Sequence, residues 1–84
     1  MAGKVLLFGR LKDAFGASFV ALPEGAATAA ALRLRLAELH PDIAAQIIAK
    51  SVRIAINQQL VADEATARIS TTDEIALLPP LSGG

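Results

Sequence analysis

The sequence predicts an α+β fold, in which one main helix and a second short helix accompany a mixed sheet of about five strands. Short apolar segments compatible with strands lie near both ends of the 84 residues, and one long segment with helical periodicity separates them. Glycine or proline follows most of these segments, as is typical of element boundaries. The length predicts a single domain, with the main helix packed on one face of the sheet.

The first two strands are expected at residues 5–8 and 18–22, joined as a hairpin. Both faces of the first strand are apolar, which is typical of a strand covered on both sides. We expect the intervening residues 10–17 to form a turn in which Gly16 takes a left-handed conformation, because glycine adopts positive φ without a steric penalty.

A helix is expected over residues 29–39, with Thr28 as its N-cap. Three leucines at the spacing i, i+4 and i+7 predict its buried stripe: Leu32, Leu36 and Leu39. Three consecutive alanines further favour helix, because alanine has the highest intrinsic helix propensity.

A second short helix is expected within residues 41–50. Pro41 disfavours helical geometry at the residue before it, so the main helix should end there. Proline is also favoured in the first turn of a new helix. On this interpretation Ile43 and Ile47 point inward.

The remaining strands are expected at 52–56, 60–61 and 74–78, with the turn of a second hairpin at 57–59. The prolines at 79–80 should end the pairing of the last strand, because proline donates no backbone hydrogen bond. A hairpin, a crossing helix and further strands follow the order of the β-grasp (ubiquitin-like) fold. In that fold the first and last strands lie parallel at the centre of the sheet.

One face of this expected sheet has no element left to cover it. The main helix accounts for the other face, so Leu6, Phe8, Ala76 and Leu78 should lie on the open one. Hydrophobic residues make up 54% of the chain, more than so small a domain readily buries. An exposed apolar patch usually marks a surface that binds a partner.

Composition argues against several other classes of function. Eight basic residues balance eight acidic ones without a basic run, so no nucleic-acid partner is expected. The absence of cysteine excludes disulfides and thiolate metal sites, and no metal site is expected. The longest uncharged stretches, 14–23 and 75–84, are too short to span a membrane, so we expect a soluble, cytoplasmic protein.

The chain carries little that predicts catalysis on its own. Its one histidine, His40, adjoins Pro41 and is expected to be a solvated helix-end residue, so the serines have no base partner. The carboxylate pairs at 63–64 and 73–74 are expected to be solvated rather than to form an acid–base site. No glycine-rich phosphate loop is present.

The last residues, LSGG, offer a different chemistry. We expect residues 1–80 to form the domain and 81–84 a flexible tail whose terminal carboxylate, on Gly84, is the reactive group. A carboxylate needs activation, for example as an acyl-adenylate, before sulfur can replace oxygen. Gly83 and Gly84 would fit a narrow channel because they lack Cβ atoms. Leu81 and Ser82 would extend the reach of the tail, and the two prolines would stiffen its base.

Three stretches together carry a family resemblance: KVLLFGRLKDAFG, IAINQQLV and DEIALLPPLSGG. The chain resembles, over essentially its whole length, the small subunit of molybdopterin synthase, a sulfur carrier of the molybdenum-cofactor pathway. The acidic residue, apolar strand, two prolines and terminal Gly-Gly are its most specific part. Members commonly have glycine where this chain has Thr72, which leaves the geometry of that turn open.

The resemblance implies a β-grasp fold and a chemistry that other proteins perform on Gly84. An adenylating enzyme related to ubiquitin-activating enzymes would use ATP to form an acyl-adenylate there. A sulfur donor would then yield the thiocarboxylate. The carrier would insert its tail into the large catalytic subunit, usually in a heterotetramer, and pass sulfur to cyclic pyranopterin monophosphate. No cofactor would be bound by the carrier itself. The partner-binding residues implied are Phe8, Leu60, Leu78, Pro79 and Pro80.

Two alternatives remain open from the sequence. The related sulfur carrier for thiazole synthesis in the thiamin pathway shares the fold and the terminal chemistry, but those proteins are typically shorter and lack the double proline. A ubiquitin-like interaction module or protein modifier would have the same fold with a different use for the Gly-Gly end.

Overall fold

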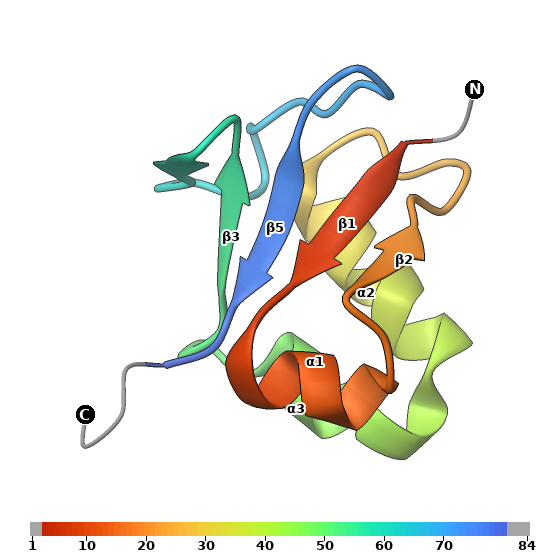
Figure 1. The fold of residues 1–84 in the computed structure, drawn as a ribbon. Helices are drawn as coiled ribbons and strands as arrows, with labels where there is room; N and C mark the ends of the chain where they lie inside the picture. Colours follow the sequence, from red (N-terminus) through yellow and green to blue (C-terminus); the bar gives the residue numbers. More distant parts are fainter. Residues whose placement is uncertain (1–2, 81–84) are drawn as a thin grey trace.

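The computed structural model describes residues 3–80 of the chain (Figure 1). Its elements are β1 (Lys4–Leu7), α1 (Gly9–Phe15), β2 (Phe19–Ala21), α2 (Ala29–Leu39), a 3-10 turn (Pro41–Ile43), α3 (Ala44–Ile48), β3 (Arg53–Ile56), β4 (Gln59–Leu60) and β5 (Ile75–Leu78). The predicted tail, with Leu81, Ser82, Gly83 and Gly84, lies outside the described residues.

The five strands form one mixed sheet in the order β2-β1-β5-β3-β4. The first and last strands, β1 and β5, run parallel at its centre, and β2, β3 and β4 pair antiparallel with their neighbours (Figure 1). This arrangement, with helices on one side, is the predicted β-grasp fold. A central strand is covered on both faces and therefore needs apolar residues on both. This requirement explains why β1 and β5 consist almost entirely of apolar residues.

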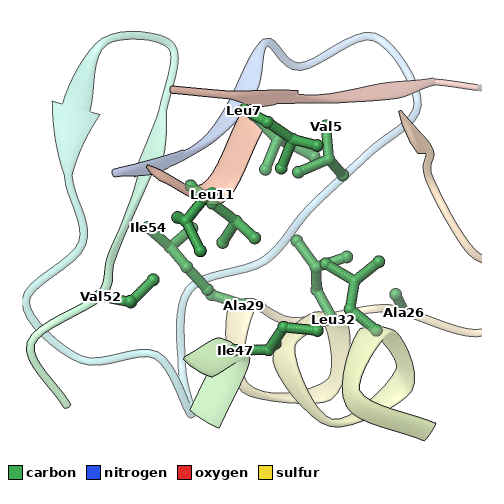
Figure 2. Close-up of a cluster of buried hydrophobic side chains, with 12 residues drawn as sticks. Val5, Leu7, Leu11, Ala26, Ala29, Leu32, Ile47, Val52 and Ile54 are labelled. Atoms are coloured by element: carbon green, nitrogen blue, oxygen red, sulfur yellow. The ribbon is translucent and has the colours of Figure 1, made fainter. Parts of the chain in front are cut away.

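The hydrophobic core fills the space between the sheet and the helices (Figure 2). Strand period 2 sends alternate residues inward. The inward residues of the sheet, each at most 2% exposed, are Val5, Leu7, Ile54, Ile75 and Leu77. They meet side chains from all three helices, of which the largest buried ones are Leu11, Leu32, Leu36 and Ile47. The helices therefore form one layer, on one face of the sheet.

The main helix agrees with its predicted bounds but not with its predicted stripe. The Oγ1 of Thr28 accepts a hydrogen bond from the backbone N–H of Ala31 at 3.2 Å, as expected of an N-cap. Leu32 and Leu36 are buried, whereas Leu39 is 52% exposed, so its inclusion in the stripe was wrong. Leu39 is the last residue of α2, and the chain turns away beyond it. Ala29, at the first turn, completes the buried stripe instead.

The segment after β1 forms a helix, α1, whereas residues 10–17 were predicted to form a turn. Two signals in the sequence mark it. Leu11 and Phe15 have the spacing i, i+4, and the structure buries Leu11 and packs Phe15 against the core. Gly16 takes φ 74°, and its backbone N–H bonds the Lys12 carbonyl, which is a usual way to end a helix. The left-handed Gly16 was therefore predicted correctly, but as part of a turn rather than as a helix stop.

The second hairpin is tighter than predicted. Its turn consists of Asn57 and Gln58, with φ 53° and 70°, whereas Gln59 already belongs to β4 and pairs with Ile56. Positive φ at both central positions is the geometry of the two-residue type I′ turn, whose twist matches that of the flanking strands. The twist of the strands therefore favours the two-residue turn, and the predicted three-residue turn at 57–59 was wrong.

The segment after α2 forms the predicted second helix, α3, with Ile47 buried and Ile43 packed against the core. Arg33, which lies beside Leu32 on α2, fixes this segment in place. Its Nη1 donates to the carbonyl oxygens of Ile47 and Ala49, at 2.7 and 3.0 Å, and its Nη2 donates to that of Val52, at 2.7 Å.

The same guanidinium also binds the carboxylate of Glu64 through Nε and Nη2. All five N–H donors of Arg33 are therefore used, and its side chain is 11% exposed. The residue joins α2, the connection from α3 to β3, and the loop after β4. Only the planar fork of arginine can satisfy partners on so many segments at once.

Candidate functional site

The candidate site is the sheet face opposite the helices. Because Val5, Leu7, Ile75 and Leu77 point into the core, their neighbours on β1 and β5 point outward. The strand register aligns an outward row across the sheet: Phe19 on β2, Leu6 on β1, Ala76 on β5, Ala55 on β3 and Leu60 on β4. This row, with Phe8 and Leu78, is called the open face below.

Two small residues make the centre of the open face concave. Ala55 and Ala76 lie directly opposite each other on β3 and β5, and they are only 6% and 8% exposed. Larger side chains stand around them: Phe8 is 47% exposed and Leu60 55%. The result is a hollow of about 190 Å³ lined by Phe8, Ala55, Gln58, Leu60, Glu74, Ala76 and Leu78. Such a hollow suits an apolar side chain of a partner.

A second hollow, of about 320 Å³, continues the open face toward the end of β5. Leu60 and Leu78 line both hollows, and Pro79 and Pro80 line the second one. The apolar surface is therefore continuous from Phe8 to the point where the described chain ends. A partner that covered the open face would also reach the base of the predicted tail.

Charge is sparse on this surface. The two hollows together contain one carboxylate, that of Glu74, and one guanidinium, that of Arg53, whose Nη2 donates to the Val61 carbonyl at 3.1 Å. A surface with few charges is covered at little desolvation cost. Between residues 3 and 80, no three His, Cys, Asp or Glu side chains gather as a metal site would need.

The structure brings together all five residues assigned to partner binding by resemblance: Phe8, Leu60, Leu78, Pro79 and Pro80. The sequence reading did not include Phe19, which is 45% exposed on the same face. Its position follows from the register of the first hairpin, which pairs it with Leu6 and which no local sequence pattern specifies. Phe19 extends the open face onto the edge strand β2.

The polar residues considered for catalysis have structural contacts instead. The ring of His40 packs edge-on against Phe15, with 4.7 Å between the ring centroids. Of the first carboxylate pair, Glu64 binds Arg33, and Asp63 accepts a hydrogen bond from the Ala65 backbone. Asp73, in the second pair, holds the turn before β5 through the backbone of Ser70. Each of these groups stabilises the local backbone or the packing.

A scan against family models matches residues 5–84 to the ThiS family. The chain belongs to this family. The match extends over nearly the whole sequence, including both strands that form the centre of the open face. Within the part of the chain that the structure describes, no helix has the length and apolarity needed to cross a membrane.

Curated relatives of this ThiS-family chain include the molybdopterin synthase sulfur carrier subunits of Dictyostelium discoideum and Haemophilus influenzae. The first is 32% identical over 83 residues, covering 96% of this chain and 94% of the relative. The second is 34% identical over 80 residues, covering 95% and 96%.

Solved structures show the same fold. Small archaeal modifier protein 1 (SAMP1) from Haloferax volcanii matches with a TM-score of 0.79 at 24% identity, covering all of both chains. A complex of subunits 1 and 2 of the molybdopterin-converting factor from Helicobacter pylori contains a chain that matches with a TM-score of 0.64. That chain is 26% identical, and the match covers all of both chains. These likenesses confirm the β-grasp fold.

Proposed function

We propose that this chain is the sulfur carrier subunit of a molybdopterin synthase and has no catalytic activity by itself. The observation that carries the proposal is the likeness to two relatives of that name over nearly their full lengths. The carrier role also agrees with the residues described above, whose titratable groups hold structure rather than gather at a reactive centre.

The proposed chemistry takes place on the carboxylate of Gly84. One carboxylate oxygen attacks the α-phosphorus of ATP on an adenylating enzyme, pyrophosphate leaves, and an acyl-adenylate forms. Sulfide-level sulfur from a donor then attacks the acyl carbon and expels AMP, which gives the thiocarboxylate. The large synthase subunit transfers that sulfur to cyclic pyranopterin monophosphate, and water takes its place at the acyl carbon, which restores the Gly84 carboxylate. In this scheme Leu81, Ser82 and Gly83 carry the reactive end into the partner.

The open face is the proposed docking surface for the large subunit. It is apolar and concave, its two hollows contain, within residues 3–80, only the charges of Glu74 and Arg53, and it leads to Pro79 and Pro80 at the base of the tail. At its other edge the ammonium of Lys4 lies over the ring of Phe19, 4.6 Å from the ring centroid. Docking there would fix the point from which the tail enters the partner. The complex of subunits 1 and 2 from Helicobacter pylori supports an assembly of this kind.

The molybdopterin pathway is favoured over thiazole synthesis by the names of the two relatives. The likeness to SAMP1, at 24% identity, reflects the fold and favours neither use of the Gly-Gly end. A thiocarboxylate on the tail tests the carrier role, and binding of the large synthase subunit tests the pathway.

Incubating the chain with its adenylating enzyme, ATP and a sulfur donor should exchange one oxygen atom for one sulfur atom. Intact-mass measurement would detect the exchange, and fragmentation should place it in the C-terminal peptide. A known carrier, treated in parallel, shows that the reagents are active. An unchanged mass in this chain beside a sulfurated control would contradict the proposed function.

Phe8→Asp should weaken binding of the large subunit by roughly 30-fold or more, because it places a carboxylate in the apolar hollow and removes an aromatic anchor. Binding is measured by calorimetry with the purified large subunit. Leu34→Asp is the matched control, since Leu34 is 61% exposed on α2, in the helical layer on the opposite face. Equal losses for both variants would show that the open face is not the docking surface.

A further inference from the structure

The β3–β4 hairpin carries Leu60 to the rim of the open face, and beyond Leu60 the Val61 N–H donates to the Ile54 carbonyl at 2.9 Å. β4 contains only two residues, and its ladder with β3 has two pairs, Ala55↔Leu60 and Ile56↔Gln59. β4 is also an edge strand, and Leu60 itself is 55% exposed. A hairpin this short is only marginally stable by itself. Contacts outside the β3–β4 ladder therefore have to fix its position.

The side chain of Asn57 supplies such contacts. The backbone N–H of Asn57 donates to the carbonyl of Glu74 at 2.7 Å, and its Oδ1 accepts from the backbone N–H of Glu74 at 2.9 Å. Its Nδ2 donates to Oδ1 of Asp73 at 3.0 Å. Asn57 therefore continues the β3–β5 ladder one step beyond the pair Ile56↔Ile75, with its own backbone N–H as donor and its side-chain Oδ1 as acceptor in place of the backbone carbonyl.

Asp73, which accepts the hydrogen bond from the Asn57 amide, is itself held in place by the turn before β5. Its Oδ2 accepts the backbone N–H of Ser70 at 2.9 Å, and its own backbone N–H donates to the Ser70 carbonyl at 3.1 Å. Hydrogen bonds from the Ser70 backbone and then from the Asn57 amide hold the pKa of Asp73 below its usual range. These bonds close the turn at 70–73.

The connection adjoins the docking hollow directly. The hollow is lined by Gln58, which follows Asn57, by Glu74, which follows Asp73, and by Leu60 on β4. A shift of the hairpin relative to β5 would therefore move Leu60 relative to Leu78 and reshape both hollows, which these two leucines share.

We propose that Asn57 and Asp73 are positioning residues of the docking surface, which tie the hairpin to the start of β5 and so hold Leu60 where the large subunit meets it. This inference rests on the proposed function, because it takes the large subunit as the partner. It assigns to the IAINQQLV stretch a role in binding that is exerted through Leu60.

Asn57→Gly tests the inference with little effect on the backbone. Glycine accepts the positive φ of this position, and the backbone N–H at position 57 still donates to Glu74. The substitution removes only the two side-chain bonds. We expect roughly 10-fold weaker binding of the large subunit from the same organism, measured by calorimetry well below the melting temperature. Asp73→Ala should act in the same direction, because it removes the acceptor for the Asn57 amide.

A double-mutant cycle with Leu60→Ala distinguishes positioning from a general loss of stability. If Asn57 acts through Leu60, then Asn57→Gly should cost much less affinity in the Leu60→Ala background. Thr71→Ala is the control within the same turn, because among the described residues the Thr71 side chain makes no hydrogen bond. It should bind like the wild type.

The outcomes separate the two proposals. If the wild-type chain fails to bind the large subunit, the proposed function fails and the positioning role fails with it. If the wild type binds and Phe8→Asp does not, but Asn57→Gly binds as tightly as the wild type, only the positioning role is overturned. Fully additive losses from Asn57→Gly and Leu60→Ala would overturn it as well.

Discussion

Removal of Gly84 should abolish sulfur loading completely. The deletion takes away the carboxylate on which we propose the acyl-adenylate forms and leaves a chain that ends one residue short of the reactive position. Intact mass after treatment with adenylating enzyme, ATP and sulfur donor should then show no exchange of oxygen for sulfur. The large subunit, supplied with the truncated chain, should form no molybdopterin.

The same truncated chain should still fold and still bind the large subunit, because the open face is built entirely from residues before position 81. Circular dichroism and calorimetry measure the two properties. A truncated chain that supported full synthesis would show that the carboxylate of Gly84 is not the working group, because the truncated chain ends on Gly83. The result would instead fit an interaction module whose Gly-Gly end has no part in the chemistry.

Arg33→Met should destabilise the fold by about 2 to 3 kcal/mol, since it removes one partner of a partly buried ion pair, in which the Glu64 side chain is 26% exposed. The carbonyl oxygens of Ile47, Ala49 and Val52 would also lose their guanidinium donors. Urea unfolding measures the change. Arg33→Lys should recover only part of the loss, because an ammonium group offers three donors from a single point.

Arg35→Met is the matched control on the same helix. Its guanidinium is 45% exposed and pairs with Glu38 three residues on, so its removal should cost about 0.5 kcal/mol or less. If both substitutions cost the same, the network of five donors around Arg33 contributes no more than an ordinary surface ion pair. The role of Arg33 in fixing the segment after α2 would then be wrong.

Local patterns predicted most of the elements because they depend on neighbouring residues alone. The bounds of α2 follow from the Thr28 cap and from Pro41, which act within one turn of the helix. The central positions of β1 and β5 follow from their apolar residues on both faces. The short helix α1 was missed because seven residues with no side-chain N-cap give a weak signal.

The candidate site was predicted in a similar way. Phe8 and Leu78 follow from strand phase, whereas Leu60, Pro79 and Pro80 came from family resemblance. Phe19 was missed because its place depends on the register between two strands. The partner-binding roles of these residues stay predictions.

The sequence by itself therefore determined the element types other than α1, the β-grasp order and the apolar character of the open face, since these depend on period, caps and composition. Only the tertiary structure decided which polar side chains hold the molecule together. Arg33 with Glu64, and Asn57 with Asp73, are 31 and 16 residues apart in the chain. Hydrogen bonds between such residues depend on how distant segments pack, and no local pattern encodes that geometry.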